Sequence, residues 1–553
     1  MDFGRRLAAL LVASCSLAAE PDLRLVEAMQ DQDVSTARVL LQQRVNVNVP
    51  QADGATALAW AAHWDNLEIA DLLIRAGADL NAANEYGVTP LALACANGSN
   101  AMAVKLLQAG ADANAAQWSG ETALMTCSRS GSMQAVEAIL ARGGKVDALE
   151  NRRGQTALMW AVAARQTEIV RLLVSRGADV KVKSNPLRDA VPLEHKTYFW
   201  DVAEAIDDTG AASTNRPNVA GSHLAPYSSK GGYTALLFAA QRGDLAAARV
   251  LVEAGADVNA GSPDGSPLII AAASGHDQVA SYLLENGADP NAVDNYGVSA
   301  LHYAVWEGFL GLGDGRPLPT DSAWFRPNMP ELVKVLLAHG ADPNLRVTTG
   351  FPPYDFPLLR RVGNFQMSQL VHAGATAFFL AAASADVQIM RMLLAAGADP
   401  KIGTKEGATP LMVAAGLGRV TDRNKEKSGQ ALEAVKLMLE LGAEVSAREA
   451  GGRTALQGAA YGGENAIIQL LADRGADLNA MDNYGRTALL IAAGDPKRLI
   501  GIFNKRWIQL PRPHASTAEL LLKLGATPIE KLKIERRVQA DAARNASGPI
   551  TNQ

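Results

Sequence analysis

The feature that most constrains the fold of this chain is a short pattern that recurs along most of its length. The pattern opens with Thr or Ser, then Ala or Pro, then Leu, continues through small residues, and closes with Leu-Leu-x-x-Gly-Ala-Asp. Its opening residues lie 33 apart at Thr56, Thr89 and Thr122, and the same step separates Thr376 from Thr409. A unit this short cannot bury its own apolar face, so successive units must stack to share one core.

The pattern marks eleven units and a weaker unit before them. The eleven begin at Thr56, Thr89, Thr122, Thr156, Thr234, Ser266, Ser299, Thr376, Thr409, Thr454 and Thr487. The weaker unit, from Leu25 to Asn48, predicts an N-terminal cap, and the charged segment from Glu530 to Arg544 predicts a closing helix or tail. Atypical ends are expected because the terminal units of a stack must cover an exposed apolar face.

Each residue type in the pattern has a physical role. The Thr hydroxyl can cap a first helix, and a following proline such as Pro90 suits the first turn of that helix. Paired alanines such as Ala61 and Ala62 let adjacent inner helices approach closely, while Leu72 and Leu73 fill the space behind them. The glycine that follows each second helix predicts a left-handed C-terminal cap, after which a turn reaches the next unit.

The recurring unit resembles the ankyrin repeat. The resemblance rests on Thr89-Pro90-Leu91, on Ser299-Ala300-Leu301-His302 and on Gly77-Ala78-Asp79, and it extends over about residues 22–528. It implies an all-α repeat solenoid of helix-turn-helix units with β-turn fingers. It also implies a protein that acts by binding another protein and catalyses no reaction, although fold analogy indicates only the mode of action.

The period is interrupted by insertions. The step from Thr156 to Thr234 is 78 residues, and its excess predicts an inserted finger loop at 184–230 that could act as a hinge. We therefore predict an N-terminal array over 22–183, a C-terminal array over 231–528 and a charged helix or tail over 529–553. Further inserted loops are predicted at 308–329, 346–372, 417–430 and 495–516.

The N-terminus predicts export. Arg5 and Arg6 precede an apolar run, which is the layout of a secretory signal over residues 1–19. Residues 12–15 also resemble a bacterial lipobox, which would lipidate Cys15. The run is too short to span a bilayer, and no later stretch reaches the roughly 20 apolar residues required. We expect a protein of the periplasm or cell envelope, in contact with a membrane only through a lipid on Cys15, with a cytoplasmic protein as the alternative.

The remaining cysteines, Cys95 and Cys127, are too few for a disulfide framework. Both stand where neighbouring units have alanine. We interpret them as buried small apolar residues, with a redox pair as the alternative.

Charge and motifs argue against several functional classes. A net charge of -5 gives no field that attracts phosphate backbones, so no nucleic-acid partner is expected. The sequence has no nucleophile elbow, metal-binding helix or phosphate-cradling loop. We therefore assign no catalytic, cofactor-binding or metal-binding residue and expect a monomer that needs no cofactor. His302 and His276 match structural positions of the ankyrin motif, and Asp79 and its equivalents are interpreted as turn residues.

The resemblance implies a binding surface at the finger tips and at the ends of the inner helices. Tyr and Trp dominate binding hot spots because they bury a large area at a small entropy cost. The candidates at finger tips are Tyr86, Trp118, Tyr296 and Tyr484, and those at helix ends are His63, Trp64, Arg129, Gln241, Arg242, Trp306 and Tyr461. Trp60, Trp160 and Tyr303 are predicted to lie in the core. The alternative for each exposed ring is packing on a neighbouring finger.

The inserted loops hold a second set of candidate contacts: Trp324, Phe325, Arg326, Tyr354, Phe356, Arg506 and Trp507. Long loops without regular structure are usually functional or disordered. We thus expect a scaffold that binds one or a few proteins. The alternatives are a secreted effector that mimics host ankyrin scaffolds and, with less support, an enzyme with its site in an inserted loop.

Overall fold

The computed structural model describes residues 21–187, 230–305, 327–348, 373–418, 428–483, 485–494 and 513–528. The chain divides into two compact units, Met1–Val182 and Lys183–Gln553. Each unit is described by itself. We call them the N-terminal unit and the C-terminal unit.

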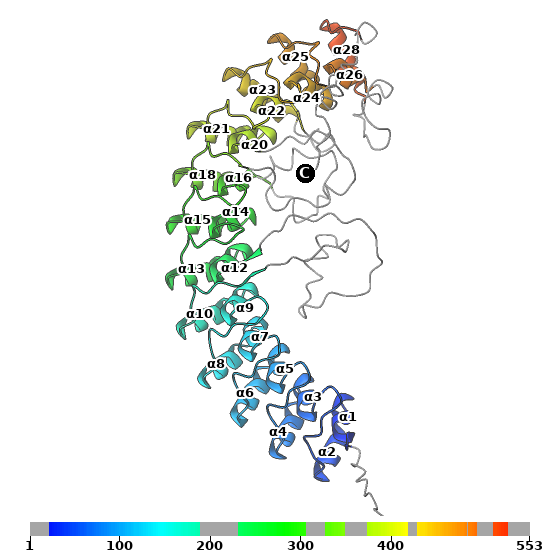
Figure 1. The fold of residues 1–553 in the computed structure, drawn as a ribbon, viewed down its shortest axis with the longest axis vertical. Helices are drawn as coiled ribbons and strands as arrows, with labels where there is room; N and C mark the ends of the chain where they lie inside the picture. Colours follow the sequence, from blue (N-terminus) through cyan, green and yellow to red (C-terminus); the bar gives the residue numbers. More distant parts are fainter. Residues whose placement is uncertain are drawn as a thin grey trace, which may run out of the picture. The chain divides into compact units, whose positions relative to one another are not determined.

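The N-terminal unit is a stack of helix pairs in which inner helices form one row and outer helices a second row (Figure 1). The inner helices are α1 (Arg24–Gln30), α3 (Ala57–His63), α5 (Pro90–Ala96), α7 (Ala123–Ser130) and α9 (Ala157–Ala163). The outer helices are α2 (Val34–Gln42), α4 (Leu67–Arg75), α6 (Asn100–Ala109), α8 (Met133–Ala141) and α10 (Thr167–Ser175). The weaker N-terminal unit also forms a helix pair, α1 and α2.

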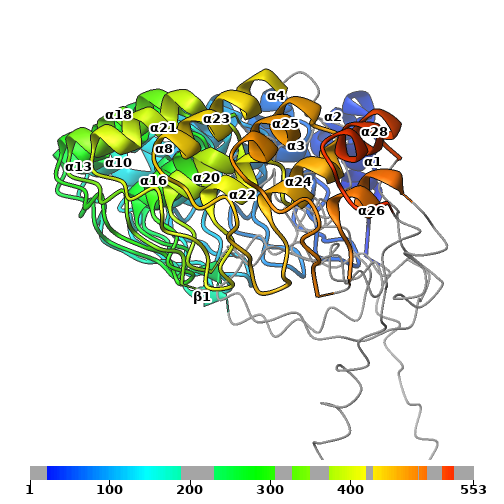
Figure 2. The same ribbon diagram turned by 90° about the horizontal axis from the view of Figure 1, so that it is seen from above.

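The C-terminal unit repeats this arrangement. Its inner helices are α12 (Ala235–Arg242), α14 (Pro267–Ala273), α16 (Ala300–Ala304), α20 (Ala377–Ala383), α22 (Pro410–Ala414), α24 (Ala455–Gly462) and α26 (Ala488–Ala493). Its outer helices are α13 (Leu245–Glu253), α15 (Asp277–Glu285), α18 (Pro330–Ala338), α21 (Val387–Ala395), α23 (Ser428–Glu440), α25 (Asn465–Asp473) and α28 (Ala515–Lys523). Within each unit the fingers extend from one side of the helices (Figure 2).

Short strands add to the predicted all-α solenoid. β1 (Pro186–Leu187) pairs antiparallel with β2 (Lys230–Gly231), so a two-residue ribbon closes the ends of the inserted finger loop. The inserted segments themselves lie almost wholly outside the described residues, as do Cys15 and the C-terminal segment from residue 529. In the part of the chain that is described, no helix is long and apolar enough to cross a membrane.

The residues that open and close the helices act as predicted. The Thr56 hydroxyl accepts a hydrogen bond from the Ala59 backbone N–H at 3.3 Å, and Thr376 caps α20 in the same way. Gly77 follows α4 with φ of 85°, in the left-handed region that favours glycine. A Cβ at Gly77 would meet no atom within 4 Å, so this position requires glycine for its backbone conformation and not for space.

The core lies between the two rows of helices. Ala61, Ala62 and Leu73 are completely buried, which confirms the packing roles predicted for small and large apolar residues. Tyr303 is buried as predicted, but Trp60 and Trp160 are only half-buried, and the prediction that both lie in the core was wrong. The Trp60 indole reaches Gln51 on the first finger, and the Trp160 ring lies under Arg129 of the preceding inner helix.

Cys95 and Cys127 form a disulfide between α5 and α7. This corrects the expectation of two separate thiols, although both residues are buried as predicted. The physical reason is the close contact of adjacent inner helices at these alanine-like positions. The two Cα atoms are 4.5 Å apart, which is within the range that a disulfide can bridge.

A row of asparagines joins successive repeats at seven junctions of the described chain. Asn48 donates from Nδ2 to the Gly77 carbonyl at 3.1 Å and accepts at Oδ1 from the Asp79 N–H at 2.7 Å. Asn344 makes the same pair of bonds to Gly397 and Asp399 at 3.0 and 2.8 Å. The asparagine ladder consists of Asn48, Asn81, Asn114, Asn259, Asn291, Asn344 and Asn479, each of which accepts a backbone N–H of the following repeat.

Candidate functional site

The fingers of the N-terminal unit form a continuous edge because their backbones are hydrogen-bonded to one another. The Glu85 N–H donates to the Asp53 carbonyl at 2.7 Å, and the Trp118 N–H donates to the Tyr86 carbonyl at 3.1 Å. Asn151 continues the series to Ser119 at 2.7 Å. The side chains at successive finger tips are therefore held in a fixed order along the stack.

Two large rings stand exposed on this edge. The Trp118 side chain is 71% exposed and the Tyr86 side chain is 53% exposed, so neither packs on its own solenoid. The turn that presents Tyr86 is built by Asn84, whose Oδ1 accepts the N–H groups of Tyr86 and Val88 at 3.0 and 2.9 Å. Hydrogen bonding to Glu85 raises the pKa of Tyr86.

Three rings gather at the end of α3. Trp60 and Trp64 are stacked with ring centroids 6.1 Å apart, and the His63 ring meets Trp64 edge-on at 4.5 Å. The Trp60 indole N–H donates to Gln51 Oε1 at 2.8 Å, which fixes the cluster to the first finger. Trp64 is still 41% exposed. This preordered ring is available to a partner at little entropy cost.

A cation–π contact continues the surface across the later repeats. The Arg129 guanidinium at the end of α7 lies 5.0 Å from the centroid of the Trp160 ring on α9. Arg129 is half-buried there, and the Trp160 indole N–H is buried without a hydrogen-bond partner. We use the name aromatic surface for the five predicted residues of the N-terminal unit that lie on the fingers and at the inner-helix ends: His63, Trp64, Tyr86, Trp118 and Arg129.

The predicted residues of the C-terminal unit lie in less exposed or more dispersed positions. Gln241 and Arg242 are exposed at the end of α12. Tyr296 is half-buried beside the Asp294 turn, and Tyr461 is half-buried at the end of α24, where burial raises its pKa. The other predicted contacts lie outside the described residues: Trp306, Trp324, Phe325, Arg326, Tyr354, Phe356, Tyr484, Arg506 and Trp507.

The two histidines interpreted as structural have structural contacts. His302 is buried, its Nδ1 lies 2.8 Å from Ser299 Oγ, and its Nε2 lies 3.1 Å from the Leu345 carbonyl. Burial lowers the pKa of His302 to about 4, so the ring is neutral at physiological pH. The His276 ring packs against Gly243, where an added Cβ would come within 2.5 Å of it. Both rings thus contact the backbone of a neighbouring segment, His302 at Leu345 and His276 at Gln241.

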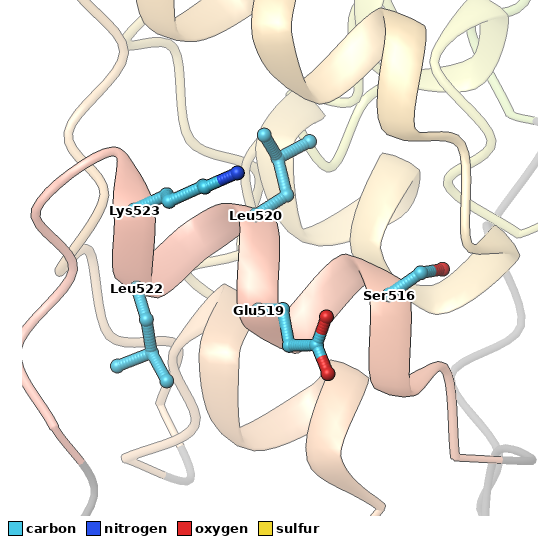
Figure 3. Close-up of a pocket in the computed structure, with 5 residues that line it drawn as sticks. All are labelled: Ser516, Glu519, Leu520, Leu522 and Lys523. Carbon is cyan, nitrogen blue, oxygen red and sulfur yellow. The ribbon is translucent and has the colours of Figure 1, made fainter.

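The described part of the chain contains no cluster of three His, Cys, Asp or Glu residues that could hold a metal ion. A shallow surface hollow lies on α28, lined by Ser516, Glu519, Leu520, Leu522 and Lys523. Figure 3 shows that these side chains come from one helix and point in several directions, so they do not converge on one point.

A set of exposed aliphatic residues was missed by the sequence analysis, which considered only rings at the fingers. Leu149 and Val293 are each about half exposed, and each directly precedes a buried acid, Glu150 or Asp294. Side chains alternate in direction along extended backbone, so the residue before a buried acid points outward. An apolar residue directly before such an acid is the sequence signal that identifies Leu149 and Val293.

Comparison with known families agrees with this architecture. The model described as ankyrin repeats (3 copies) matches residues 25–117, 102–184, 236–347 and 426–499, which is more than half of the chain. The single ankyrin repeat model matches residues 373–405. A search of curated proteins gave no match to the chain.

Proposed function

Because the chain belongs to the ankyrin-repeat family, we propose that it is a non-catalytic scaffold that binds a partner protein through its finger tips and inner-helix ends. Ankyrin repeats are generally protein–protein interaction modules. The observation that carries the proposal is the aromatic surface, on which Trp64, Tyr86 and Trp118 remain exposed. Each such ring removes roughly 150–250 Å² from water when it is covered, and Trp and Tyr are the residues most enriched at hot spots.

We propose in addition that the protein is exported to the periplasm or cell envelope, either free or anchored through Cys15. Two observations support this location. The N-terminus has the layout of a secretory signal, and the Cys95–Cys127 disulfide would persist in an oxidising compartment and would be reduced in most cytosols. Cell fractionation and mass spectrometry of the mature N-terminus test the location and the lipid together.

The proposed binding is tested by a crosslinked pull-down from native envelope extract with tagged mature protein as bait. A second bait has the substitutions Trp64→Ala, Tyr86→Ala and Trp118→Ala. The control bait has Val39→Ala and Leu522→Ala, because these apolar side chains are 51% and 46% exposed but lie on the outer helices α2 and α28. Circular dichroism and thermal unfolding verify that all baits are folded.

One protein recovered by the native and control baits, and lost with the triple variant, is the expected result. Equal recovery by all three baits would contradict the proposed surface and move the contact to another part of the chain. Recovery of no specific protein by any bait would contradict the scaffold function itself in this extract.

A further inference from the structure

The exposed rings of the first repeats in the N-terminal unit stand among carboxylates that form no ion pair with any described residue. We propose that the partner binds here through a segment that carries an arginine next to an apolar side chain. The arginine would lie on the rings at the end of α3, and the apolar side chain would lie against Tyr86 and Trp118. This inference rests on the proposed function and specifies the kind of partner.

Another indole of the same unit shows how this position binds a guanidinium. Trp60 and Trp160 are equivalent, since each lies four residues after the Thr that caps its inner helix. The Arg129 guanidinium of the preceding repeat lies 5.0 Å from the centroid of the Trp160 ring. Before Trp60 the position equivalent to Arg129 holds the uncharged Gln30, which accepts a hydrogen bond from Gln51. Trp60 therefore has no cation from that position of the described chain.

Three exposed carboxylates lie on the fingers and in the turn after α3. Asp65 directly follows Trp64, Asp53 lies on the first finger, and Glu85 lies on the second finger. The pKa of Tyr86 is raised by hydrogen bonding to Glu85 and by the charges of Glu85 and Asp53. Both finger carboxylates therefore lie close to an exposed ring.

Hydrogen bonds join the rings of α3 to these fingers. The Trp60 indole N–H donates at 2.8 Å to Oε1 of Gln51, which lies on the same finger as Asp53. The Glu85 N–H donates to the Asp53 carbonyl at 2.7 Å and so attaches the second finger to the first. The rings and the carboxylates thus belong to one connected surface.

The acids on the outer helix of the same repeat are paired with cations, in contrast to the three carboxylates. Glu68 forms an ion pair with Arg38, and Asp71 forms ion pairs with Arg75 and Lys105. Residues 45–104 contain a single Lys or Arg, which is Arg75. A positive side chain of a partner would therefore supply a charge that this part of the surface does not supply itself.

The chemistry of the surface favours arginine over lysine. A guanidinium stacks on an aromatic face and donates to two carboxylate oxygens at once, whereas an ammonium is a compact, strongly hydrated point charge. The Asp65 Oδ1 accepts the Ser99 hydroxyl, while its Oδ2 accepts no hydrogen bond from the described residues. An apolar side chain next to the arginine is expected because Tyr86 and Trp118 are 53% and 71% exposed on the adjoining fingers.

The test selects peptides on the full mature chain from a random library. Peptides of about 12 residues suffice, because they span about 40 Å when extended. The neutral variant combines Asp53→Asn, Asp65→Asn and Glu85→Gln. Each amide keeps an oxygen that can accept the hydrogen bond of the carboxylate it replaces, so the turns should be retained.

The control variant combines Glu68→Gln, Glu137→Gln and Glu168→Gln. It changes the net charge by the same amount, but at exposed positions on the outer helices α4, α8 and α10. The ion pairs that it removes are exposed and contribute little to stability. Circular dichroism and thermal unfolding verify the fold of each protein before selection.

We expect the native chain to select peptides with an arginine beside an apolar residue. Fluorescence polarisation at low ionic strength, where exposed charges contribute most, should show that such a peptide binds the neutral variant roughly tenfold more weakly than the native and control proteins. Replacing the peptide's arginine by glutamine should cause a similar loss on the native and control proteins. It should cause little further loss on the neutral variant, because both changes remove the same contact.

Selected peptides without a basic residue would overturn the inference, and so would equal affinity for the native and neutral proteins. An equal loss with the control variant would overturn it too, because the effect would then come from net charge. Selection of no peptide would mean that the partner does not bind through a segment. In each of these cases a partner lost with the triple ring variant in the pull-down leaves the proposed function standing, whereas failure of both experiments would overturn both.

Discussion

The two units pack their inner helices through the same small residues but add different links between repeats. In the N-terminal unit Cys95 and Cys127 stand at two of these positions and form a disulfide between α5 and α7. In the C-terminal unit buried polar side chains of the inner helices bond to the finger that follows: His302 meets the Leu345 carbonyl, and Gln457 donates to the carbonyls of Ala480 and Arg486. The repeat pattern thus specifies where the helices touch and leaves open which further links are added.

The units also differ in the surface that they present. The N-terminal unit keeps a regular period and holds the exposed rings in order, whereas the inserted segments fall in the C-terminal unit. A regular spacing holds the side chains of successive repeats at constant intervals, so that one partner can contact several of them.

The largest effect is expected from removing the disulfide. Replacing Cys95 and Cys127 together by Ala should lower the stability of the N-terminal unit by about 3–4 kcal/mol, since the bond closes a loop with a sequence separation of 32. Alanine fits because Ala62 and Ala161 occupy the equivalent positions. Hydrogen exchange followed by mass spectrometry measures each unit separately. Equal loss of protection in both units would contradict the comparison.

We expect the stability of the C-terminal unit to fall more at low pH than that of the N-terminal unit, because of His302. Its pKa falls from 6.5 to about 4 on folding, so the unfolded chain binds the proton more tightly. The contribution of the neutral His302 ring to stability is fully present above pH 6.5. It is lost as the pH falls towards 4, by about 3 kcal/mol.

The matched variant is His302→Gln. Gln457 stands at the equivalent position of its own repeat, where it forms a capping box, and its side chain does not titrate. Urea unfolding at pH 7.5 and pH 4.5 should show a smaller acid loss for this variant than for the native chain. An unchanged difference between the two pH values would mean that other groups cause it.

Helix caps should contribute equally in the two units. Thr89 and Thr376 each accept a backbone N–H of their own helix. Their replacement by Ala should cost about 1 kcal/mol in either unit. Urea unfolding of the two single variants measures this cost, and a difference of more than twofold would show that the repeats are not equivalent in local structure.

The smallest effect on stability is expected on the aromatic surface. Because the Trp118 side chain is 71% exposed, Trp118→Ala should change the free energy of unfolding by less than about 0.5 kcal/mol. The same substitution should weaken binding of the partner recovered in the pull-down by about 2 kcal/mol. Calorimetric titration gives the affinity, and a large loss of stability would show that the ring supports the fold.

The helices and their caps were predictable because their causes are local. Thr56 and Gly77 act through their own backbone neighbourhood, so their spacing was enough to place the helix boundaries. The disulfide and the half-exposure of Trp60 and Trp160 depend on contacts between repeats, which spacing alone does not describe. The candidate contacts in the inserted loops lie on segments that follow no period and fall outside the described residues.

The asparagine ladder has a consequence for how such a protein can vary. Its bonds join residues 28 to 31 apart in uninterrupted repeats and 48 to 55 apart where an insertion intervenes, yet the Oδ1 contacts stay at 2.7–2.8 Å throughout. The alignment of successive repeats therefore does not depend on how many residues lie between two successive asparagines of the ladder. Whole loops could be grafted, shortened or exchanged between repeats, and new recognition segments could be acquired, with the same scaffold beneath them.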